Sequence, residues 1–170
     1  WMINTEGINI LMNLFFGVAI NAARGVANQV DGAIMRFVTS FTTALNPQIT
    51  KDYAKGNMPA LYKLVCNGAK YTFFLMLFFQ LPAILEANTL LHVWLKNVPD
   101  HAVTFLQLTM VGTMFNMLGN TQLTACMATG NIKRYTIVVT LVGILVFPIT
   151  WIAFALGMPP ESCYVAFIIV

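Results

Sequence analysis

Two opposite charges lie within one long and otherwise mostly uncharged stretch of this chain. Asp31 and Arg36 stand inside residues 21–50, NAARGVANQVDGAIMRFVTSFTTALNPQIT. Charges at membrane depth are costly, and they usually mark a pathway or a buried pair. Asp31 and Arg36 are five residues apart, which is about 140° around a helix, so they are not neighbours on one helix face. We therefore expect each to face another helix.

Residues 21–50 separate into an apolar and a polar face when they are placed on a helix. The apolar face carries Val30, Ile34, Phe37, Phe41 and Leu45. The polar face carries Asn28, Asp31, Thr39, Thr42 and Asn46, with Gln29, Arg36, Ser40 and Thr43 beside it. At about 1.5 Å per residue, residues 25–50 extend roughly 39 Å, enough to cross the hydrocarbon core of a bilayer. We expect a membrane helix whose polar face borders something wet or polar.

The composition of the whole chain indicates an integral membrane protein. Of its 170 residues, 58% are hydrophobic and 9% are charged, and the mean hydropathy is +0.75. An average soluble domain has about 25% charged residues, so this chain has too few to cover a globular surface. The net charge of +3 comes from clustered lysines, which indicates membrane topology rather than nucleic-acid binding. The chain starts at Trp1 and stops inside an apolar run, so we expect a fragment of a longer protein.

The apolar segments predict an all-α fold, a polytopic transmembrane bundle of about six helices in one domain, residues 1–170. The expected helices cover residues 3–21, 25–46, 65–91, 103–128, 136–156 and 162–170, the last one truncated. Residues 22–26 are the expected first connection, and Pro47 is expected to end the second helix. A polar loop of residues 48–64 is expected to follow.

The basic residues of the loops predict an alternating topology. Cytoplasmic loops of membrane proteins carry an excess of Lys and Arg. Lys51, Lys55, Lys63, Lys133 and Arg134 fall on one side of an up-and-down bundle, and Arg24 and Lys96 fall on the other. We therefore place the first group in the cytoplasm.

Two polar features allow two interpretations each. Glu6 is either part of a cavity or coupling site facing Arg36, or an interfacial carboxylate near a helix start, where the helix dipole favours it. The fourth helix carries Thr109, Thr113, Asn116, Asn120 and Thr124 at helical spacing. These side chains are either a second wall of a polar cavity or a source of interhelical hydrogen bonds.

Motifs of catalysis are absent from the sequence. It has no nucleotide-binding GxxxxGK[ST], no HExxH, no GxSxG and no Cys/His spacing typical of a metal site. We expect no catalytic residue, no metal and no cofactor. A channel needs a selectivity filter or a ring of charges, and neither is evident. What remains is secondary transport through a polar cavity formed by amphipathic helices.

Several stretches resemble one branch of a transporter superfamily. They are GxxxNAARGVANQV at residues 17–30, TALNPQI at 43–49, and the basic K-x-YAxG at 51–56. LLHVWLKNVPDHAVTFLQL and ACMATGNIKRY, further along the chain, extend the resemblance. They are similar to the polysaccharide flippases (the Wzx-like branch) of the superfamily that includes the MATE multidrug antiporters and the lipid II flippase.

The resemblance implies one half of a MATE-like two-bundle transporter in the bacterial inner membrane. Its cargo would be an oligosaccharide on undecaprenyl pyrophosphate, a precursor of O-antigen, capsule or exopolysaccharide, flipped by alternating access. Arg24 and Arg36 would then bind phosphate or sugar oxygens, and Asn28, Gln29 and Asn116 would hydrogen-bond hydroxyls. Asp31 would balance Arg36 or couple transport to a cation, H⁺ or Na⁺. Further partners would be membrane lipids and glycan polymerase or assembly proteins.

Two other functions stay open at this point. A cation-coupled multidrug exporter of the same superfamily would have a more acidic, aromatic-lined cavity, whereas arginine is at least as prominent here as Asp31 and Glu6. A non-transport membrane subunit of a glycan-assembly complex would leave flipping intact and change glycan length or assembly.

Overall fold

The computed structural model describes residues 2–128 and 132–169, and every regular element within them is an α-helix. The helices are α1 Met2–Phe16, α2 Val18–Ala54, α3 Met58–Leu85, α4 Ala87–Trp94, α5 Ala102–Ala128, α6 Lys133–Ala155 and α7 Ser162–Ile169. The prediction of an all-α bundle is confirmed at this level, with seven helices among the described residues in place of about six.

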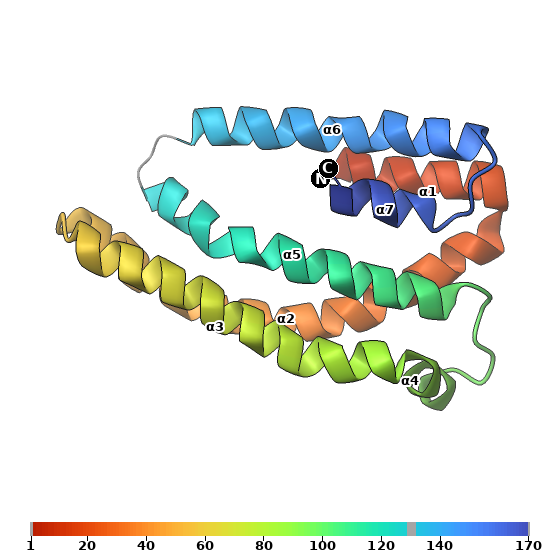
Figure 1. The fold of residues 1–170 in the computed structure, drawn as a ribbon, viewed down its shortest axis with the longest axis horizontal. Helices are drawn as coiled ribbons and strands as arrows, with labels where there is room; N and C mark the ends of the chain where they lie inside the picture. Colours follow the sequence, from red (N-terminus) through yellow and green to blue (C-terminus); the bar gives the residue numbers. More distant parts are fainter. Residues whose placement is uncertain (1, 129–131, 170) are drawn as a thin grey trace.

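The helices form an elongated bundle with α5 running through its middle (Figure 1). α2 and α3 form a long hairpin, and α5 packs against both of them. α6 lies along the opposite side of the bundle from this hairpin, and it contacts α1 and α7. α2 packs against α1, α3 and α5, and much of the rest of its surface stays exposed.

The first connection lies at Gly17, not at residues 22–26. Gly17 has φ +84° and is the residue between α1 and α2. This left-handed conformation strains any residue with a Cβ, which makes glycine the suitable residue here. Arg24 and Gly25 continue the helix instead, because the alanines around them favour helical backbone. The predicted loop was wrong, and Arg24 lies inside α2.

α2 also passes through Pro47, where the sequence predicted its end. It continues to Ala54, and Ile49, beyond the proline, is fully buried. A proline costs the helix one hydrogen bond, and here the packing of the following turn offsets that loss. The expected loop of residues 48–64 shrinks to a tight turn, in which Gly56 has φ +68° and the Asn57 side chain caps α3. This correction explains why α2 reaches 37 residues.

The expected third helix, residues 65–91, is two helices in the structure. α3 ends at Leu85, Glu86 follows, and α4 runs from Ala87 to Trp94. α4 buries Ala87 and Leu91 and exposes Val93 and Trp94, so it is a short amphipathic helix. The helices expected at 103–128, 136–156 and 162–170 agree with α5, α6 and α7 to within a few residues at each end.

The core and the apolar surface fit a protein in a membrane. Met12, Phe105, Leu106 and Met110 are fully buried where α1 and α5 meet the rest of the bundle. Among the described residues, α3, α5 and α6 are long and apolar enough to cross a membrane. α6 exposes many large apolar side chains, a surface suited to lipid. α2 is longer than these three helices, but its polar face keeps it out of this set.

Candidate functional site

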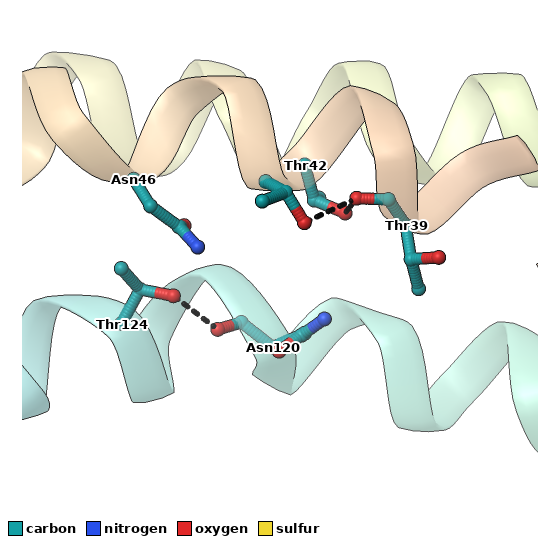
Figure 2. Close-up of a pocket in the computed structure, with 6 residues that line it drawn as sticks. Thr39, Thr42, Asn46, Asn120 and Thr124 are labelled. Atoms are coloured by element: carbon teal, nitrogen blue, oxygen red, sulfur yellow. Dashed lines mark hydrogen bonds between the residues drawn. The ribbon is translucent and has the colours of Figure 1, made fainter. Parts of the chain in front are cut away.

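A small polar pocket lies between α2 and α5 (Figure 2). Its volume is about 150 Å³, and its lining residues are Thr39, Thr42, Thr43, Asn46, Asn120 and Thr124. All six are neutral, and each carries a hydroxyl or an amide. In Figure 2 the Asn46 side chain of α2 points across the pocket toward α5. A pocket of this kind between membrane helices can hold water or the hydroxyls of a polar ligand.

The hydroxyls of the polar pocket already have acceptors for their protons. Thr42 donates to the backbone oxygens of Val38 and Thr39, and Thr43 donates to that of Thr39. On α5, Thr124 donates to the backbone oxygen of Asn120 at 3.3 Å. Because these protons are directed into the helices, the hydroxyl oxygens keep lone pairs for a donor in the pocket. The amides of Asn46 and Asn120 add both donors and acceptors.

The polar side chains of α5 were expected either to line a cavity or to make interhelical hydrogen bonds. The structure shows both, at different positions along the helix. Asn120 and Thr124 form one wall of the polar pocket. Thr113 makes an interhelical hydrogen bond instead, as described below. Asn116 is exposed and lines neither this pocket nor the groove described below. The structure therefore separates Asn116 from the residues with which the sequence grouped it.

Asp31 is the centre of a junction that joins three helices. Its carboxylate oxygen Oδ1 accepts a hydrogen bond from Gln80 Nε2 of α3 at 3.0 Å and one from Thr113 Oγ1 of α5 at 2.9 Å. Gln80 Nε2 also lies 3.0 Å from Thr113 Oγ1. Asp31 is 5% exposed and Gln80 is fully buried. Asp31 thus faces other helices, as its spacing from Arg36 indicated, and it does not balance Arg36.

Arg24 belongs to a second polar network, on the side of α2 that faces α1. Its Nη1 donates to Asn9 Oδ1 at 2.5 Å, and Asn9 Nδ2 donates to Glu6 Oε2 at 3.3 Å. Arg24 is 8% exposed. Glu6 therefore connects to Arg24 through Asn9 rather than to Arg36. This places Arg24 in a packed helix interface, away from both the polar pocket and the groove.

The remaining predicted residues line an open groove between α2 and α4. Asn28, Gln29 and Arg36 are exposed on α2 and share a space of about 800 Å³ with Leu90, Val93 and Trp94 of α4. The three α2 residues that the sequence predicted as substrate-binding thus line one groove. Sequence reasoning missed the α4 wall, because residues 65–91 were predicted as one continuous helix.

Sequence reasoning also missed Gln80. A glutamine within the uncharged, Phe-rich part of α3 was the available signal, since polar side chains in membrane helices tend to bond across helices. Its partner Asp31 was identified, but no pattern within one helix gives the pairing of two helices.

Within the described residues, no group of three or more His, Cys, Asp or Glu side chains is placed to hold a metal ion. The one ion pair recorded there joins His101, before α5, to Glu161, before α7. No protein-family model, curated protein or solved structure matches the chain. The geometry of α2 and its neighbours is therefore the basis for assigning a function.

Proposed function

We propose that this chain is part of a membrane transporter that moves a lipid-linked oligosaccharide across the bilayer by alternating access. The observation that supports it most is the polar pocket between α2 and α5. It is lined by neutral hydroxyl and amide groups inside a strongly apolar chain. Polar groups within a membrane bundle are expensive, and they mark the path of a polar substrate.

The chemistry of the polar pocket suits sugar hydroxyls. A sugar hydroxyl donates one hydrogen bond and accepts others, so it pairs with both threonine oxygens and asparagine amides. Thr42, Asn46 and Asn120 present both kinds of group. A pocket for a lipophilic cation would instead have acidic or aromatic walls. The lining therefore favours an oligosaccharide over a drug as the cargo.

The finer features of the proposal come from the resemblance to the polysaccharide flippases. They are the undecaprenyl-pyrophosphate carrier, the bacterial inner membrane and an ion gradient of H⁺ or Na⁺. Arg36 supports the carrier, because an exposed arginine on α2 can hold a phosphate through two parallel hydrogen bonds. Arg24 is not included in this proposed phosphate site, because its guanidinium donates a hydrogen bond to Asn9.

The test uses cells that lack the gene for the full-length protein. We expect the lipid-linked oligosaccharide to accumulate on the cytoplasmic face of the membrane and the surface glycan to be lost. Unchanged glycan display with increased drug sensitivity would support an exporter instead. Normal flipping with altered glycan length would support a subunit of an assembly complex.

Variants of the pocket residues, expressed in the same cells, test whether the polar pocket lies on the transport path. Asn46→Leu combined with Asn120→Leu should fail to restore surface glycan at a normal protein level. Asn88→Leu is the matched control, because Asn88 is exposed on α4 and lies outside the lining of both the polar pocket and the groove. Full restoration by the double variant would remove the polar pocket from the transport path.

A further inference from the structure

We propose that a buried water molecule binds between α2, α5 and α7, held by Arg24, Thr109 and Tyr164. None of these three residues lines the polar pocket or the groove. The water site is therefore independent of the proposed transport function. α7 packs directly against α5 and α6, and the water would add a link from α7 to α2.

Each of the three helices contributes a buried polar atom without a partner. Arg24 Nε of α2, Thr109 Oγ1 of α5 and the Tyr164 hydroxyl of α7 have no hydrogen-bond partner among the described residues. Arg24 and Tyr164 are each only 8% exposed. A buried polar group without a partner is costly, so such groups are paired with protein or with ordered water in folded proteins. These three atoms therefore need a partner.

The side chains that carry these atoms lie close together. The Tyr164 hydroxyl interacts with the side chains of both Thr109 and Arg24, although neither contact has the geometry of a direct hydrogen bond. The Tyr164 ring packs against Phe105, with ring centroids 5.2 Å apart, and Phe105 lies one turn before Thr109 on α5. Polar side chains that are near one another without being directly bonded are the arrangement that a bridging water completes.

The charges around the site favour a neutral ligand. The Arg24 guanidinium excludes a cation. It also donates to Asn9 Oδ1, and Asn9 connects to Glu6, so a negative charge is already near the guanidinium and no bound anion is needed. A water molecule can accept from Arg24 Nε and from one hydroxyl, and it can donate to the other hydroxyl. This makes about three hydrogen bonds, the usual number for a buried water.

Radiolytic footprinting of the full-length protein in lipid nanodiscs tests the site. X-ray irradiation converts water into hydroxyl radicals that modify side chains next to it, and mass spectrometry measures the rate at each side chain. Met76 is the matched comparison, because it is fully buried in an apolar cluster with Val38 and Met117 and methionine is readily oxidised. We expect Tyr164 and the adjacent buried Cys163 to be modified about tenfold faster than Met76, since only they would lie beside water.

Variants of Thr109 distinguish a bound water from general access of solvent to α7. Thr109→Val removes the hydroxyl, so the modification rate of Tyr164 should fall about threefold or more. Thr109→Ser keeps the hydroxyl and should keep the wild-type rate. Thr104→Val is the matched control, because Thr104 is exposed on the same helix, and it should leave the rate unchanged. The comparison of Tyr164 with Met76 needs no variant, so the test holds even if Thr109→Val lowers the protein level.

Modification of Tyr164 as slow as that of Met76 would overturn the inference. An equal Tyr164 rate in wild-type and Thr109→Val protein would also overturn it, since water would then reach the ring without this site. A Tyr164 rate that falls as the chloride concentration is raised would overturn it too, because the ligand would then be an anion. Transport of the oligosaccharide without the Tyr164 footprint would remove the water site and leave the proposed function. The footprint without transport would keep the water site and remove the function.

Discussion

The side chains of Asp31 and Gln80 lie 49 residues apart in the sequence and meet at 3.0 Å in the interior of the bundle. Thr113 of α5 completes the contact by donating to the same Asp31 oxygen. The junction joins α2, α3 and α5 at the level of the α2 residues that line the groove, and the polar pocket lies further along α2. Buried polar networks help to specify one helix arrangement, and in this one the Gln80 Oε1 atom is buried without a hydrogen-bond partner among the described residues.

Removing the Asp31 carboxylate should therefore destabilise the bundle. Asp31→Leu removes the acceptor that Gln80 and Thr113 share, although Gln80 keeps its bond to Thr113 and Thr113 its bond to the backbone oxygen of Met110. Two hydrogen bonds to a charged group are lost, each contributing about 1.5–3 kcal/mol. Asp31→Asn retains an oxygen at the same place and should lose much less. Chemical unfolding of the purified protein in detergent measures the difference. Equal stability of the Leu and Asn variants would contradict the junction.

Arg24 is expected to act in stability rather than in cargo binding. Arg24→Ala and Asn9→Ala should each lower the free energy of unfolding, because they break the bond between α2 and α1. The double variant should lose less than the sum of the two. A hydrogen bond to a charged group contributes about 1.5–3 kcal/mol, and this sets the expected coupling. Strictly additive losses would show that the two side chains do not interact.

Gly7 is expected to be required for the contact between α1 and α6. A Cβ at this position would lie 2.8 Å from a ring atom of Phe147. Gly7→Ala requires the ring to move slightly, whereas Gly7→Val requires α1 and α6 to separate. We expect the loss of stability to increase from Ala to Val, with Val costing about 1–3 kcal/mol. Gly25→Val, with open space around its Cβ, provides the comparison.

The His101–Glu161 contact is expected to keep the start of α7 closed. It ties the residue before α5, which has φ +66°, to the turn that precedes buried Cys163. His101→Ala should increase the rate at which a maleimide reacts with Cys163, measured with Cys66 and Cys126 replaced by Ser. Exposed ion pairs contribute about 0.2–1 kcal/mol, so the increase should be at most about fivefold. An unchanged rate in both His101→Ala and Glu161→Gln would exclude this role.

The sequence predicted those parts of the fold that depend on composition and local period. The all-α bundle followed from the apolar runs, and the positions of α5 and α6 followed from their uncharged spans. The connection at Gly17 and the passage of α2 through Pro47 were mispredicted. Both depend on tertiary packing, which decides where a helix ends when local preferences are weak.

The candidate site, like the fold, was predicted from the sequence only in part. The helical period correctly placed Thr39, Thr42 and Asn46 on one face of α2. It could not say which helix each polar residue meets, since that depends on the rotation of α5 and α4 about their axes. For this reason Asp31 and Arg24 belong to buried networks, while Arg36 lines an open groove.

The central claim is that the polar pocket between α2 and α5 carries sugar across the membrane. Its most direct test is the flipping rate of the full-length protein in liposomes containing a fluorescent lipid-linked oligosaccharide. The fraction accessible to an added glycosidase reports flipping with time. We predict rapid flipping by the wild type, and at most a tenth of that rate for Asn46→Leu combined with Asn120→Leu. Wild-type flipping no faster than in empty liposomes, or an undiminished rate in the double variant, would contradict the claim.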